Sequence, residues 1–245
     1  MISETGRDAH FVEDTSMVKA NNLHHLAIST GDIKRQIAFF SDVLGAELVA
    51  LYWMHGVEGT FHGFVKLNDK VSIAFVQGPK TGSIAPIMGV SHSGNAADPS
   101  APGTMQHLAL NVDGKAELLA MRDRIRSRGV NVVGPIDHGF CQSIYFAGPE
   151  HLALEISTSD APIDARAWID PEVVALTGIS AEELAAFRAP APYAGEGGSV
   201  AQPPYDPAKP QVSFPPEVYK RMLAMPDEVF TARTSEPTPP VRLAG

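Results

Sequence analysis

The chain contains one short pattern twice, and each copy begins with a histidine. Residues 23–28 (LHHLAI) and 105–110 (MQHLAL) are apolar runs typical of strands, and each precedes a helical pattern that ends at a glycine. The copies are offset by 82 residues (107 − 25) when His25 is aligned with His107. This repetition predicts two copies of one structural unit.

Each copy predicts a βαβββ unit, so the expected fold class is α+β. For the first copy we expect a strand at 23–29, a helix at 33–44 and strands at 47–53, 63–67 and 71–77. For the second copy we expect a strand at 106–112, a helix at 116–128 and strands at 130–133, 142–146 and 152–157.

Composition divides the chain into five segments. They are an N-terminal arm (1–20), a first module (21–80), a connecting loop (81–103), a second module (104–160) and a C-terminal extension (161–245). Helix starts are indicated at Asp170 and Ser180. Beyond residue 189 prolines recur every few residues, which predicts an irregular Pro-rich tail with one helix at 216–225.

Charge and hydropathy exclude several classes of partner. The formal charge is −9 without a long basic cluster, so neither nucleic acid nor an anionic membrane is expected to bind. No apolar run approaches the roughly 18 to 20 residues of a membrane helix. The single cysteine excludes an internal disulfide, and the polar first residues lack a secretory signal. We therefore expect a cytoplasmic location.

Two histidines and a glutamate on separate strands suggest a metal site. One strand histidine is by itself more often a packing residue, but His25 and His107 occupy matching places in a repeat. Glu155 lies within an apolar strand, where an unpaired carboxylate is costly and a divalent cation removes that cost. Because side chains alternate across a strand, only one of His24 and His25 is expected to face the site.

Three stretches resemble the vicinal oxygen chelate superfamily, which includes glyoxalases, bleomycin-resistance proteins and extradiol dioxygenases. Residues 25–32 (HLAISTGD) and 39–45 (FFSDVLG) resemble the opening of its modules, and 148–156 (GPEHLALEI) resembles its closing motif. The resemblance covers residues 21 to 158. It implies paired βαβββ modules that form a curved mixed sheet around a metal.

The same resemblance implies the ligands and the metal. His25 is preferred to His24 because Asp32 then falls at the superfamily's usual interval, and His107 and Glu155 fill the other two positions. Two histidines and one carboxylate leave coordination positions open, an arrangement associated with non-haem Fe(II). Mn(II), Zn(II) and Ni(II) are the alternatives.

Comparison with the branches of the superfamily favours ring cleavage. Residues 71–77 contain no carboxylate, whereas metal-dependent glyoxalases draw a fourth ligand from that strand. Tyr145 and His138 match positions near the metal in extradiol dioxygenases. Those enzymes also carry an acid-base histidine where this chain has Lys70, so His62 or His92 is expected to replace it.

The leading hypothesis is thus an Fe(II)-dependent extradiol-type dioxygenase that uses O₂ to open a catechol-like aromatic ring, with Tyr145, His138 and His62 as catalytic residues. The alternative is a glyoxalase-like lyase or isomerase in which a redox-inert metal stabilises an enediolate from a vicinal-oxygen substrate. A metal-free ligand-sequestering protein ranks third. We expect a homodimer, in which the modules pair either within or between chains.

Overall fold

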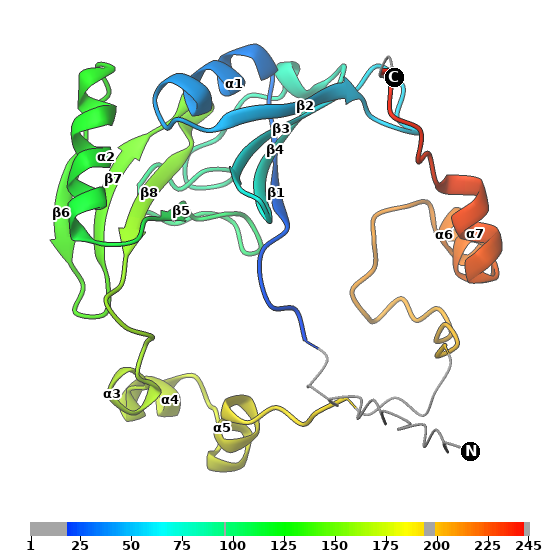
Figure 1. The fold of residues 1–245 in the computed structure, drawn as a ribbon. Helices are drawn as coiled ribbons and strands as arrows, with labels where there is room; N and C mark the ends of the chain where they lie inside the picture. The colour runs from blue at the N-terminus through cyan, green and yellow to red at the C-terminus, as the bar shows by residue number, and fades with distance from the viewer. Residues whose placement is uncertain (1–18, 96, 194–198, 243–245) are drawn as a thin grey trace, which may run out of the picture. The chain divides into compact units, whose positions relative to one another are not determined.

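The first repeat forms a four-stranded mixed sheet covered by one helix. This computed structural model describes residues 19–95, 97–193 and 199–242, so most of the predicted N-terminal arm lies outside it. The elements are β1 (His25–Ser29), α1 (Ile33–Asp42), β2 (Glu47–Trp53), β3 (Phe61–Asn68) and β4 (Val71–Gln77). The sheet order is β1-β4-β3-β2, with β1 parallel to β4 and the other pairs antiparallel (Figure 1).

The second repeat has the same topology. Its elements are β5 (Leu108–Asn111), α2 (Lys115–Ser127), β6 (Val133–Asp137), β7 (Gln142–Ala147) and β8 (Ala153–Thr158), in the sheet order β5-β8-β7-β6. The predicted α+β fold of paired βαβββ modules is therefore confirmed. The strand predicted at 130–133 is wrong, because β6 only begins at Val133. Pro135 cannot donate to a neighbour and is accommodated on this edge strand, where the register shifts between Val133 and Ile136.

One hydrophobic core serves both modules. Helix α1 begins at the cap Asp32, whose carboxylate accepts from Arg35 N, and packs on β3 and β4. Helix α2 packs on β7 and β8. The helix-facing residues of both sheets join one buried cluster, which includes Phe40, Phe75, Leu118 and Ile144. We call the opposite face of each sheet, which α1 and α2 do not cover, its open face.

Polar contacts at both ends of α1 join the modules. The Glu150 carboxylate accepts hydrogen bonds from Thr30 Oγ1 at 2.6 Å, Gly31 N at 2.8 Å and Gln36 Nε2 at 2.8 Å. At the other end of α1, the guanidinium of Arg124 donates to two carbonyl oxygens of its last turn. A cation at this end of a helix is favourable because it opposes the helix dipole.

The remaining elements are short. The turns η1 (Thr81–Ser83) and η2 (Pro149–His151) and the helix α3 (Ala165–Trp168) belong to a compact unit of residues 23–168 and 236–245. A separate unit of residues 1–22 and 169–235 holds the four helices α4 (Pro171–Leu176), α5 (Ala181–Arg188), α6 (Pro216–Leu223) and α7 (Asp227–Thr234). Helix α7 is not predicted by the sequence pattern. In the described ranges no helix has the length and apolar character needed to cross a membrane.

Candidate functional site

The open face of the second sheet brings together two of the three predicted ligands. His107 lies one residue before β5, and Glu155 lies in the centre of β8. The Nε2 atom of His107 is 2.9 Å from Oε2 of Glu155, whose side chain is only 7 % exposed. A nearly buried carboxylate beside an imidazole nitrogen is a donor set that suits a divalent metal.

Tyr145 and His138 extend this pair across the sheet. Tyr145 on β7 is the direct partner of Glu155 in the antiparallel ladder. The hydroxyl of Tyr145 is 2.9 Å from Nε2 of His138, which lies in the turn between β6 and β7. Burial raises the pKa of Tyr145, and the nearby charge of Glu155 raises it further. The phenol therefore stays protonated at neutral pH and can donate a hydrogen bond.

The open face of the first sheet carries an aromatic group. His62 on β3 contacts Phe64 with ring centroids 4.5 Å apart, and its Nδ1 is 3.4 Å from the hydroxyl of Tyr52. His25 contacts Phe64 from β1 at 5.5 Å. Burial lowers the pKa of His62, and the proximity of His25 lowers it further. The predicted residues His25 and His62 thus share one face, but Phe64 was missed, although alternation with His62 could have revealed it.

The strand registers show how the two modules correspond. Ala109 pairs with Glu155 in the second module, and Ala27 pairs with Ala74 in the first. Ala74 therefore occupies the place of Glu155 in the first module. By the same comparison Phe64, which pairs with Ala74, stands in the place of Tyr145.

Two predicted features differ in the structure. His24 and His25 do not separate onto opposite faces, because β1 begins at His25 and leaves His24 outside the regular strand. Their Nδ1 atoms lie 2.8 Å apart. Among the residues described, no group of three or more His, Cys, Asp or Glu side chains is placed to hold a metal, so His25 does not join His107 and Glu155 within one chain.

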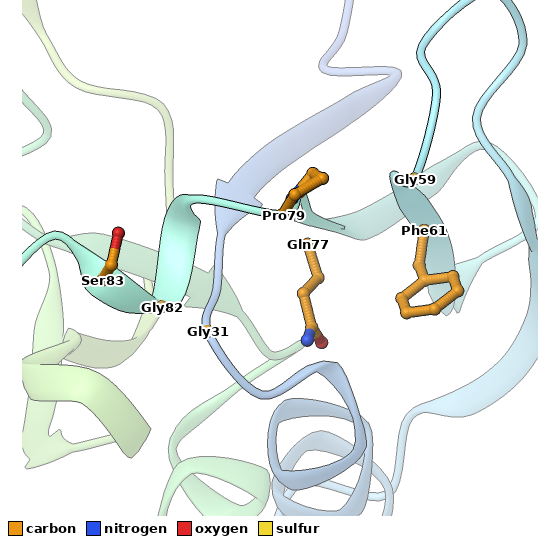
Figure 2. Close-up of a pocket in the computed structure, with 8 residues that line it drawn as sticks. Gly31, Gly59, Phe61, Gln77, Pro79, Gly82 and Ser83 are labelled. Carbon is orange, nitrogen blue, oxygen red and sulfur yellow. The ribbon is translucent and has the colours of Figure 1, made fainter.

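None of these site side chains lines either of two pockets found in the described residues. A pocket of about 400 Å³ lies at the end of β4, and none of its lining residues is titratable (Figure 2). These residues are Gly31, Gly59, Phe61, Gln77, Gly78, Pro79, Gly82 and Ser83. Another of about 1020 Å³ lies beside β1 and η2 and is lined in part by His92 and His151. His92 therefore lies in that pocket rather than with the histidine and glutamate pair.

Comparison with known proteins identifies the superfamily. A family model described as "Glyoxalase/Bleomycin resistance protein/Dioxygenase superfamily" matches residues 22–156. The chain belongs to this superfamily. Its members are mostly enzymes and bind divalent metals.

Individual relatives are more distant. A lactoylglutathione lyase of Salmonella typhimurium is 28 % identical over 138 residues, which are 55 % of this chain and 90 % of that protein. A solved glyoxylase/bleomycin resistance protein/dioxygenase domain from Frankia sp. EAN1pec has a TM-score of 0.47 at 13 % identity and covers 58 % of this chain and 99 % of its own. The fosfomycin resistance protein FosX from Listeria monocytogenes has a TM-score of 0.40 at 18 % identity and covers 58 % and 95 %.

Proposed function

We propose that the chain is a metal-dependent enzyme that cleaves a catechol-like aromatic ring with O₂, in the manner of an extradiol dioxygenase. The observation that carries this proposal is the row His107, Glu155, Tyr145 and His138 on one open sheet face. Two of these side chains can hold a metal, and the other two can hold and move protons beside it.

The roles follow from the contacts. A divalent metal, Fe(II) in this proposal, would be held by His107 and Glu155, where it would supply Lewis-acid activation of the substrate oxygens and a path for electrons from the oxidised substrate to O₂. Tyr145 donates a hydrogen bond to a substrate oxygen, since its hydroxyl lies beside Glu155 and stays protonated. His138 accepts from or donates to that hydroxyl, and it is exposed, so it can exchange protons with water.

The third ligand, His25, is proposed to come from a second copy of the chain. His25 and His107 hold equivalent places before or at the edge strands β1 and β5, and both sheets leave the open face uncovered by their helices. A homodimer that apposes the first module of one copy with the second module of the other would complete the site. It would also cover His62, whose buried Nε2 has no hydrogen-bond partner among the described residues.

Oxygen uptake tests the activity. Protein purified without air, reloaded with Fe(II) and offered a panel of catechols is expected to consume O₂ and to yield a yellow ring-opened product. Glu155→Ala is expected to abolish uptake, whereas Glu182→Ala, which removes a surface acid of α5, should leave it unchanged. Absence of uptake across the panel by iron-loaded protein would reject the dioxygenase proposal.

Mixing two inactive variants tests the shared site. His25→Ala and Glu155→Ala chains that exchange subunits would form heterodimers with one intact site of two. Random exchange makes half of the dimers heterodimers, so about a quarter of the wild-type activity should return. A site built within one chain would give no recovery.

A lyase or isomerase is the second candidate, because the relative from Salmonella typhimurium is a lactoylglutathione lyase. Such chemistry needs a metal and a base but no oxygen. Ala74 opposes this candidate, since no carboxylate of the first module is available at that place as a fourth ligand. Turnover of a glutathione hemithioacetal that is unchanged under strict anaerobiosis would select it.

A further inference from the structure

The turn that carries His138 is covered by a side chain from beyond the second module. After β8 the chain continues into α3, which ends at Trp168. The Trp168 indole contacts the ring of Phe140 edge-on, with centroids 4.9 Å apart and an interplanar angle of 78°. A Cβ added at Gly139 would lie 2.8 Å and 2.9 Å from two atoms of the same indole. Trp168 therefore packs directly on the backbone next to His138.

The contacts within the turn explain why this packing matters. His138 N donates to Cys141 O at 2.9 Å, and Gly139 N donates to Asp137 Oδ1 at 2.8 Å. Gly139 has a φ of +84°, a conformation that other residues rarely adopt. These bonds fix the shape of the turn itself, but the His138 side chain is exposed, and among the described residues it is held by its bond to Tyr145 alone. A tilt of the turn would move the His138 imidazole away from the Tyr145 hydroxyl.

We propose that Trp168 is a positioning residue that clamps the 137–141 turn and thereby keeps the His138 imidazole on the Tyr145 hydroxyl. The inference rests on the proposed function for the role of His138, whereas the clamp itself rests on the packing of the turn. It assigns a part in the site to the first segment of the C-terminal extension, which lies outside the two repeated modules.

Removal of the indole should leave the module folded. Trp168 is 48 % exposed, so it is not a core residue. It borders a cleft of about 260 Å³ lined also by Cys141, Lys115 and Asp160, and truncation would widen this cleft rather than create a sealed void. The chain also offers a matched control, because Trp53 is 63 % exposed and contacts Phe61 at 4.6 Å in the first module.

The contact between the rings of His138 and Tyr145 can be measured without any substrate. In the full-length protein we expect nuclear Overhauser effects between the ring protons of His138 and Tyr145. They should disappear in Trp168→Ala, persist in Trp168→Phe, which keeps an aromatic ring against the turn, and persist in Trp53→Ala. Full retention of these effects in Trp168→Ala would overturn the clamp, and this result stands even if the proposed activity is never found.

Kinetics then test the link to the site. With an active substrate, Trp168→Ala should lower kcat about tenfold while KM changes less than twofold, and Trp168→Phe should restore most of the rate. In a His138→Gln background Trp168→Ala should have no further effect, because the clamp acts through His138. An equal loss in both backgrounds would contradict a positioning role. If Trp168→Ala loses the Overhauser effect but the wild type turns over no substrate, the clamp stands and the proposed function is rejected.

Discussion

The two modules have the same topology but different chemistry on their open faces. In the second module the cross-strand pair on the open face is Glu155 on β8 and Tyr145 on β7. The equivalent pair of the first module is Ala74 on β4 and Phe64 on β3. Both modules keep the histidine that opens the repeat. Beside this shared histidine, the first module therefore has an apolar, aromatic wall, and the second module has the carboxylate and the phenol.

This difference shows how a repeated fold can form one asymmetric site. If both modules carried a glutamate at this place, a metal between them would have four protein ligands. In the proposed site, Ala74 at this place would leave a coordination position for a substrate oxygen. Phe64, Tyr52 and His62 lie on the same face of the first sheet, and under the proposed function a flat aromatic ring would stack there.

The largest effect is expected at Glu155, and the equivalent position Ala74 provides the control. Glu155→Ala removes the only carboxylate of the row, so metal content after purification should fall to background and turnover should fall on the order of 10³-fold. Ala74→Gly removes only a methyl group at the equivalent place in the first module and should change turnover less than about threefold. Metal analysis and oxygen uptake measure both variants. Normal iron content in Glu155→Ala would refute its role as a ligand.

A second substitution makes the second module resemble the first. Tyr145→Phe removes the hydroxyl between Glu155 and His138 and should reduce kcat on the order of 10²-fold, as expected for loss of a proton-handling group. Metal content should stay at the wild-type level, because the phenol is not a ligand. The reverse change, Phe64→Tyr, should bring no gain in rate. A kcat within twofold of wild type in Tyr145→Phe would remove this residue from the mechanism.

The sequence predicted the modules well because each repeat contains its own strand and helix periods. It also predicted that His107 and Glu155 share a site, because the resemblance to the superfamily implies both as ligands, and their side chains lie 2.9 Å apart. Sequence alone could not show the irregular edge strand at Pro135, where tertiary pairing overrides local pattern. Nor could it reveal Trp168, whose contact with Gly139 joins segments that share no motif. The correspondence of Ala74 with Glu155 needs the strand registers, because an alanine carries no chemical signal of its own.

A smaller effect is expected from the hydrogen bonds that Glu150 makes between the modules, and this effect is on the stability of the fold. Burial raises the pKa of Glu150, but the hydrogen bonds from Thr30, Gln36 and Gly31 outweigh it and hold the pKa below the ordinary 4.5. A carboxyl whose folded pKa is lowered stabilises the fold above the unfolded pKa and loses this contribution as pH falls through the folded value. Glu150→Gln should therefore destabilise the protein by about 2 kcal/mol at pH 7.

Denaturant unfolding at several pH values checks this prediction. The difference between wild type and Glu150→Gln should shrink as the pH falls below about 4.5, where the wild-type carboxyl gains its proton. Glu183→Gln is a suitable control, because Glu183 also accepts a backbone hydrogen bond but only caps α5. A constant difference between pH 7 and pH 3 would show that the Glu150 charge does not hold the modules together.

The smallest effect concerns His62, the histidine of the first module that has no counterpart in the second, where Ser143 stands at the equivalent place. Its pKa lies below the ordinary 6.5 because of burial first and of His25 second, so the ring should gain its proton at a lower pH than a solvated histidine does. His25→Ala removes the second cause alone and should raise the pKa of His62, which burial still holds below 6.5. Histidine-resolved NMR titration measures both values. A titration of His62 at or above 6.5 in the wild type would show that its ring is solvated, and the first module would then lack the dry aromatic wall that distinguishes it from the second.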